Sequence, residues 1–287
     1  MQKILVIGAT GMIGNPVTKE LIQAGFDITL LSRNVQKAKQ YFPNTRIIEG
    51  DVFDPVSLAK AFEGQEALYI SLSPPRQSKP SHAMPEREGI NNVIAVAQAT
   101  GIKRIVLISS LVQRYNNTNG FNWWIFDMKE AAVQKVKTSG IPYTIFYPSS
   151  FMECFDQLLK KGNNIMLTTG SVAPNYFIAA KDYGKQVAKS FLLLTTENKE
   201  YVAQGTEAYN WDEAADIFIQ HYTKGKLKPM RMPFGMMKLF GRFSTVMNYG
   251  AHILEALNKY PEQFESANTW AELGKPTITL KQYAAGL

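Results

Sequence analysis

The chain has 287 residues, of which 45% are hydrophobic and 19% charged, a balance typical of a folded globular protein and not of a disordered one. The single cysteine, Cys154, excludes an internal disulfide, and the lack of a run of about 20 apolar residues excludes a spanning helix, so no membrane partner is expected. The net charge of +7 comes without a nucleic-acid motif, so no nucleic-acid partner is expected either, and the basic cluster at 224–233 is interpreted as a solvated loop.

The first element follows directly from the N-terminal sequence MQKILVIGATG. This stretch lacks the pattern of a secretory leader, and we therefore expect a cytoplasmic protein. Residues 3–8 form an uninterrupted apolar run, as expected for a parallel strand that is buried on both faces.

Three glycines, Gly8, Gly11 and Gly14, follow this strand at the start of a helical pattern. In a dinucleotide-binding turn the first glycine makes the tight turn, the second lets the backbone approach a pyrophosphate, and the third permits close packing of helix on strand. The helix N-terminus then offers free N–H groups to the phosphates. The position of the triplet between a strand and a helix makes it the strongest functional signal in the chain.

The end of the second predicted strand, at 27–32, indicates which nicotinamide cofactor is bound. An acidic residue at this point would hold the ribose 2′-hydroxyl of NAD, whereas an arginine accommodates the 2′-phosphate of NADP. The chain has Ser32 and Arg33 here, which predicts a preference for NADPH. Asp51, after the third strand at 45–50, is a candidate partner for the adenine amino group, and Asp54 is predicted to cap a helix that begins at Pro55.

Further apolar runs at 66–71, 103–109 and 143–148 alternate with helical patterns such as 86–99 and 129–138. Strands joined by helical crossovers predict an α/β fold with a doubly wound parallel sheet, the Rossmann arrangement. We expect an NAD(P)-binding domain over 1–150 and a smaller C-terminal α/β substrate lobe over 151–287, interleaved with the first part and not independent.

The predicted lobe has fewer clear signals. Short strands are expected at 164–170 and 199–205, and Asp182 and Asn210 are expected as helix N-caps. The stretch 229–250 is rich in Met and Phe and is interpreted either as an exposed apolar patch or as a substrate lid.

Several segments together resemble the NmrA-like branch of the atypical short-chain dehydrogenase/reductases: GATGMIG, the Ser32-Arg33 strand end, GDVFD, Lys129, SGIPYTIFYPSSFME and TWAELGKPTITLKQYA. The similarity runs along essentially the whole chain. This family includes NADPH-dependent reductases of quinones, dyes and plant phenolics, and also proteins that bind NADP without turning over a substrate.

The resemblance implies a set of cofactor contacts. The pyrophosphate of NADP(H) would be held by Gly8, Thr10, Gly11, Met12, Ile13 and Gly14. Its 2′-phosphate would be held by Ser32 and Arg33, and its adenine by Asp51 and Val52. Its adenosine ribose would be held by Ser71, Leu72 and Ser73. The nicotinamide ribose and ring would be bordered by Ser109, Lys129, Tyr147, Pro148, Ser149 and Phe151.

The chain departs from the usual Ser, Tyr and Lys catalytic set, in which tyrosine gives a proton to the carbonyl and lysine lowers its pKa. The serine position holds Leu111, and the tyrosine position, four residues before Lys129, holds Ile125. These replacements argue against a sugar-nucleotide epimerase. Lys129 remains the catalytic candidate, either as a clamp on the ribose or as the proton donor or electrostatic stabiliser itself.

Reduction of a quinone by hydride needs less catalytic assistance than reduction of a ketone, because quinones are already electrophilic. Positioning of the quinone over the nicotinamide supplies most of the rate. We therefore expect an NADPH-dependent oxidoreductase that reduces a quinone or a similar small aromatic acceptor. A non-catalytic redox-sensing regulator with a protein partner is the alternative, and a sugar-nucleotide epimerase-like enzyme the third interpretation. No metal site is expected, and a homodimer is left open. Aromatic side chains suited to stacking on the acceptor are Trp123, Trp124 and Tyr176, and Tyr115 is a candidate polar group at the substrate site.

Overall fold

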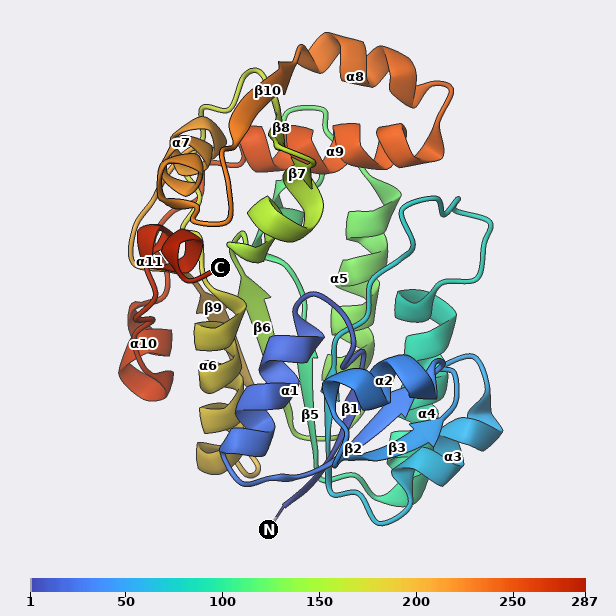
Figure 1. Ribbon diagram of the computed structural model, residues 1–287. Coiled ribbons are helices and arrows are strands. Elements are labelled where there is room, and N and C mark those ends of the chain that lie inside the picture. The colour runs from blue at the N-terminus through green and yellow to red at the C-terminus, as the bar shows by residue number, and fades with distance from the viewer. Residues whose placement is uncertain (1) are drawn as a thin grey trace.

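A computed structural model of the chain describes residues 2–287, and a parallel sheet of seven strands runs through its middle in the order β3-β2-β1-β4-β5-β6-β9 (Figure 1). The first six strands match the apolar runs expected from the sequence, and the doubly wound sheet is confirmed. Central strands are mostly apolar because helices cover both faces of the sheet. The strands are β1 Lys3–Ile7, β2 Asp27–Ser32, β3 Arg46–Glu49, β4 Ala67–Ile70, β5 Arg104–Ile108, β6 Tyr143–Pro148 and β9 Lys199–Ala203.

Helices pack on the two faces of this sheet (Figure 1). Helices α1 and α6 contribute to the hydrophobic cluster on one face, and α3, α4 and α5 contribute to the cluster on the other. No helix formed by residues 2–287 combines the length and the apolar character needed to cross a lipid bilayer. The helices of this part are α1 Gly14–Gln23, α2 Val35–Tyr41, α3 Pro55–Phe62, α4 Ile90–Thr100, α5 Trp124–Lys137 and α6 Ala180–Leu193, with short turns η1 Pro85–Gly89, η2 Leu111–Tyr115 and η3 Phe155–Leu159.

The later part of the chain builds a smaller lobe over the carboxyl ends of the strands. Its three-stranded sheet has the order β10-β8-β7, and its own hydrophobic cluster joins residues such as Phe155, Trp211 and Phe218. The elements are β7 Lys160–Lys161, β8 Asn164–Thr168, β10 Lys228–Met232, α7 Trp211–His221, α8 Phe234–Gly241, α9 Thr245–Lys259, α10 Ala267–Leu273 and α11 Leu280–Ala285.

The segment 199–205 lies in a different place from the one expected. Its strand β9 pairs in parallel with β6 as the seventh strand of the central sheet, so its assignment to the smaller lobe is wrong. The reason is that β6 is apolar on both faces and would otherwise expose an unpaired edge. Helix α6 also returns to the first part of the chain, since it packs beside α1. The lobe is therefore interleaved with the sheet.

Helix caps fix several of these elements locally. Asn210 and Glu213 form a capping box at the start of α7, and Asp54 accepts the Val56 N–H at the start of α3, as the sequence predicts. Asp182 is not a cap, because α6 begins at Ala180. Its buried carboxylate instead accepts the backbone N–H groups of Thr277 and Ile278 at 2.6 and 2.7 Å. Asp182 therefore ties the C-terminal segment to α6.

Candidate functional site

A cavity of about 520 Å³ opens at the carboxyl ends of β1, β2 and β4. The strand order reverses between β1 and β4, which is where doubly wound sheets bind nucleotides. The volume of this cavity suits a small-molecule or cofactor site. The lobe closes one side with Leu158 and Tyr249. Most of the predicted adenosine and pyrophosphate residues line this cavity: Gly8, Thr10, Gly11, Met12, Ile13, Ser32, Arg33, Asp51, Val52, Ser71, Leu72 and Ser73.

The glycine turn leaves no room for side chains at two of its positions. A Cβ on Gly8, which has a φ of +93°, would lie 2.0 Å from the Ser71 carbonyl oxygen, and a Cβ on Gly14 would lie 2.0 Å from the Gly8 oxygen. Gly14 thus packs helix against turn and does not itself line the cavity. Helix α1 has no side-chain N-cap, and Met12 and Ile13, which directly precede it, line the cavity. These features fit a bound diphosphate.

Two arginines line the main cavity. The side chain of Arg33 is 74% exposed, and its Nη1 lies 3.9 Å from Asp51 Oδ2, a distant contact that leaves the guanidinium able to reach a ligand. The second, Arg76, follows β4 and was not predicted from the sequence, because no motif marks its loop. Guanidinium groups recognise phosphate with paired hydrogen bonds. Arg33, directly after β2, therefore favours a 2′-phosphate over a free hydroxyl.

Lys129 lies beneath this cavity and not on its wall. Its Nζ is 2.6 Å from Glu86 Oε1, and the two side chains are 15% and 8% exposed. Burial opposes the charge on Lys129, but the carboxylate outweighs burial and raises the pKa of Lys129. The second oxygen of Glu86 has no partner within residues 2–287. Beside the pair and Ser109 is a small cavity of about 10 Å³, which is the size of one water molecule.

The positions of the missing serine and tyrosine are filled by packing. Leu111 is fully buried, and Ile125 is buried in a cluster with Trp123 and Phe126. Neither side chain can donate a proton to a substrate. A phenol from another element reaches the site instead, because Tyr249 of α9 lines the main cavity. Burial raises the pKa of Tyr249 and Lys129 opposes this rise. Tyr249 was not predicted from the sequence, since it comes from the lobe and only the fold brings it to the cavity.

A second cavity, of about 380 Å³, adjoins the first and shares Tyr249 with it. Trp123, Trp124, Ile125 and Phe243 contribute to its walls. The Trp123 ring stacks on His252 at 5.6 Å and meets Tyr249 edge to face at 5.0 Å. We name this space the aromatic cavity.

The other two aromatic candidates lie elsewhere. Tyr115 is buried against Phe121, and Tyr176 packs on Phe264. Neither lines the main or the aromatic cavity. Of the four predicted substrate residues, the fold therefore gathers only Trp123 and Trp124.

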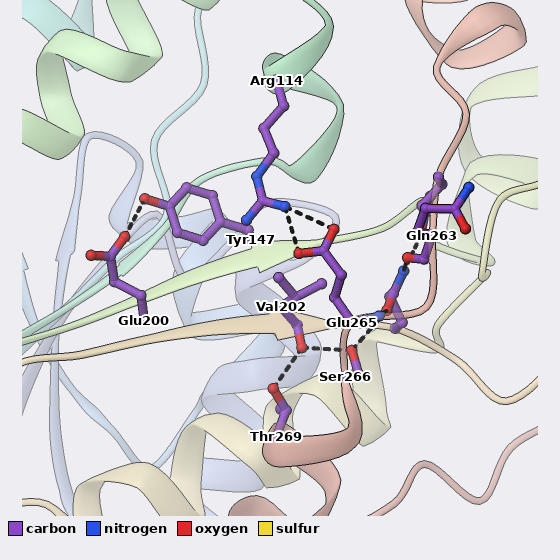
Figure 2. Close-up of polar contacts among 10 residues, drawn as sticks. Arg114, Tyr147, Glu200, Val202, Gln263, Glu265, Ser266 and Thr269 are labelled. Atoms are coloured by element: carbon purple, nitrogen blue, oxygen red, sulfur yellow. Dashed lines mark hydrogen bonds and ion pairs between the residues drawn. The ribbon is translucent and has the colours of Figure 1, made fainter.

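The end of β6 does not border the main cavity, contrary to expectation. Figure 2 shows Tyr147 pointing to Glu200, whose Oε2 accepts its hydroxyl at 2.8 Å, while Arg114 lies over the Tyr147 ring and reaches Glu265. Successive strand residues point to opposite faces of a sheet, and Tyr147 points to the face that carries α5. Tyr147 therefore points away from the main cavity, and its contact with the nicotinamide stays a prediction.

The remaining predicted neighbours of the nicotinamide are engaged in the interior. Ser149 donates to Glu262 Oε2 at 2.8 Å, Ser109 donates to Gln113 Oε1 at 2.8 Å, and Phe151 packs on Tyr183. Pro148 is buried at the end of β6. None of these side chains lines the main cavity, so their contact with a cofactor stays a prediction.

Comparison with known proteins agrees with this site. The family described as NAD(P)H-binding matches residues 8–190. The Photosystem II assembly factor Ycf39 of Cyanophora paradoxa is 26% identical over 265 residues, covering 88% of this chain and 79% of that protein. The crystal structure of Citrobacter sp. triphenylmethane reductase with NADP(H) has a TM-score of 0.78 at 22% identity, covering 99% of this chain and 100% of that chain. The NADPH complex of the quinone oxidoreductase QOR2 from Escherichia coli has a TM-score of 0.75 at 20% identity, covering 99% of each chain. The chain belongs to the NAD(P)H-binding family and shares its Rossmann-like α/β fold with these two structures.

Proposed function

We propose that the chain is an NADPH-dependent oxidoreductase that transfers hydride to a quinone or a similarly flat aromatic acceptor. The observation that carries the proposal is the common wall, Tyr249, between the main cavity and the aromatic cavity. Hydride transfer needs donor and acceptor within about 3–3.5 Å, so adjoining cavities for the two molecules are required. The names of the two similar structures, a dye reductase and a quinone oxidoreductase, support the same reaction class.

The residues of the two cavities have separate roles in the proposed reaction. The glycine turn with Arg33 and Arg76 binds the cofactor, and bound NADPH supplies a hydride. Trp124 offers a flat apolar surface that orients an aromatic ring and excludes water, and the buried Trp123 supports this wall through its contacts with His252 and Tyr249. The acceptor oxygen that gains negative charge then takes a proton from the Tyr249 phenol, which solvent reprotonates. The positive charge of Lys129 stabilises the developing anion from beneath.

The test is NADPH oxidation by the purified protein against a panel of quinones, azo dyes and aromatic aldehydes, with Tyr249→Phe beside the native chain. We expect turnover of quinones and a kcat at least about tenfold lower in the variant, since general acids typically contribute this much or more. Tyr176→Phe is the matched control, because Tyr176 lines neither cavity. Lack of NADPH consumption with every acceptor would refute the proposal.

A redox-sensing regulator is the second candidate. Buried apolar residues at Leu111 and Ile125, together with the pairing of Lys129 to Glu86, favour it, because they remove the usual proton-transfer groups. The assembly-factor name of one relative points in the same direction. Affinity capture with the apo, NADP⁺ and NADPH forms tests it, and an unchanged partner set in all three forms would exclude a cofactor-dependent sensor.

A further inference from the structure

We propose that the tip of the lobe, residues 224–246, docks on an anionic lipid surface. This segment contains β10, α8 and the first residues of α9, and we name it the α8 tip. The proposal concerns a surface contact, which needs no spanning helix. It goes beyond the proposed reductase activity and stands whether or not the chain reduces a quinone.

The α8 tip exposes apolar side chains that no other element covers. Within α8 the only buried residue is Gly241, and Phe243 just beyond the helix is 85% exposed. In a water-soluble protein, adjacent exposed apolar residues mark an interaction surface. The exposed apolar residues of the tip are Met230, Met236, Leu239, Phe240, Phe243 and Val246.

The charge of the tip has one sign. No acidic residue occurs between Asp216 and Glu255, whereas six lysines and arginines do: Lys224, Lys226, Lys228, Arg231, Lys238 and Arg242. Arg231 pairs with Asp212 and Lys238 pairs with Glu255. The other four cations are exposed and form no ion pair within residues 2–287. Apolar side chains among unpaired cations are the pattern of helices that lie on anionic membranes.

The tip is positioned to meet a flat surface. Figure 1 shows α8 at the end of the molecule far from the N-terminus, with α9 between α8 and the sheet. Helix α9 holds it there through a close glycine contact, since a Cβ on Gly241 would lie 3.1 Å from the Asn248 Cα. The outer side of α8 therefore faces away from the rest of the chain on a firmly packed support.

A lipid surface fits the tip better than a second copy of the chain does. A two-fold dimer would place the same surface against itself. The four unpaired cations would then face one another without an acidic residue of the tip to balance them. Anionic headgroups supply that balance, and the acyl region beneath them accepts the apolar side chains.

Docking in this way would also serve the proposed reaction. Gly241, Arg242 and Phe243 line the aromatic cavity as well as belonging to the tip. A docked tip therefore brings this cavity against the lipid, where an apolar acceptor is dissolved. This consequence rests on the proposed function, whereas the docking itself does not.

The experiment is sedimentation of the full chain with vesicles of equal parts phosphatidylglycerol and phosphatidylcholine, and with vesicles of phosphatidylcholine alone. We expect binding to the anionic vesicles to be at least about tenfold tighter, because each cation near such a surface adds favourable energy. High salt should reduce this difference. Equal binding to both vesicle types, or no binding to either, would overturn the proposal.

Matched variants locate the contact. Leu239→Ser with Phe243→Ser should weaken binding about tenfold or more, by the loss of apolar burial. Val56→Ser with Leu192→Ser is the control, because these residues are also exposed and apolar but lie on α3 and α6. Equal losses in both pairs would contradict the assignment to the tip. Light scattering measures the molar mass of the chain in solution. A mass of two copies for the native chain and the control pair, but of one copy for Leu239→Ser with Phe243→Ser, would assign the surface to a second copy and refute lipid docking.

Vesicle binding and NADPH oxidation are separate readouts. A chain that binds anionic vesicles but oxidises no NADPH would refute the reductase and leave the docking surface intact. A chain that reduces quinones in solution but does not bind vesicles would refute the docking surface and leave the reductase intact.

Discussion

Lys129 and Glu86 form a buried ion pair, and this pair carries a prediction about stability. Lys129→Met leaves the Glu86 carboxylate buried without its cation, which should lower the free energy of unfolding by about 3–5 kcal/mol. Adding Glu86→Gln removes the uncompensated charge and should recover most of that loss. Chemical denaturation of the two single variants and the double variant measures both effects. Equal instability of Lys129→Met and the double variant would contradict this account.

The same variants separate structure from catalysis at Lys129. If the lysine stabilises the developing charge, the double variant should remain well folded and still show a lower kcat. An unchanged kcat in a stable double variant would reduce Lys129 to a packing role.

Arg33 carries a prediction about cofactor choice. Its exposed guanidinium lines the adenosine side of the main cavity, and charge-assisted hydrogen bonds contribute about 1.5–3 kcal/mol. Arg33→Ser should therefore raise the Kd for NADPH roughly tenfold to hundredfold and leave the Kd for NADH unchanged. Isothermal titration with both cofactors measures this. Arg46→Ser at the start of β3 is the control, and equal native affinities for the two cofactors would disprove the preference.

At the scale of elements, the junction of β1 and α1 depends on the lack of a side chain at Gly14. The added Cβ of Gly14→Ala would lie 2.0 Å from a backbone oxygen, which a rotamer change does not relieve. We expect a loss of about 3 kcal/mol or more in unfolding free energy, together with loss of NADPH binding. Thermal unfolding and cofactor titration report the two effects.

The matched control for Gly14 is another helical glycine. Gly235 lies in α8, and a Cβ there meets nothing within 4 Å. Gly235→Ala should be neutral or stabilising by up to about 1 kcal/mol, because alanine favours helix more than glycine does. Comparable losses at both glycines would show that the contact with Gly8 is not what matters.

At the scale of the whole molecule, Glu262 joins the lobe to the sheet. It accepts hydrogen bonds from Ser149 after β6 and from Gln204 after β9, at 2.8 and 2.7 Å. Burial raises the pKa of Glu262 from 4.5 to about 7. The folded state therefore holds this proton more tightly than the unfolded state, and the stability from Glu262 is complete at low pH and falls as pH rises toward 7.

Glu262→Gln should remove this dependence. Between about pH 4.5 and 7 the native chain should lose more unfolding free energy than the variant, by an amount on the order of a few kcal/mol. Denaturation curves across this range measure the difference. Glu63→Gln is the control, since Glu63 is exposed at the C-terminal end of α3. Parallel pH curves for the native chain and Glu262→Gln would rule out the proposed linkage.

Features of this chain that depend on a local signal are predictable from the sequence. A strand buried on both faces is mostly apolar, so the first six strands are visible as runs. The glycine turn and the caps at Asp54 and Asn210 depend on neighbouring residues only, and they lie where expected. Asp182 failed as a cap because its partners, Thr277 and Ile278, are distant in the chain.

The sequence by itself determined the sheet, its NAD(P)H-binding turn and the loss of the usual serine and tyrosine, because each is written in contiguous residues. Only the tertiary structure decided that β9 adds a seventh strand beside β6 and that Tyr147 points away from the main cavity. It also decided that Glu86 pairs with Lys129 and that Tyr249 lines the main cavity. The exposure of α8 belongs to the same group. Burial and side-chain direction depend on which distant segments pack together, and no local pattern encodes that choice.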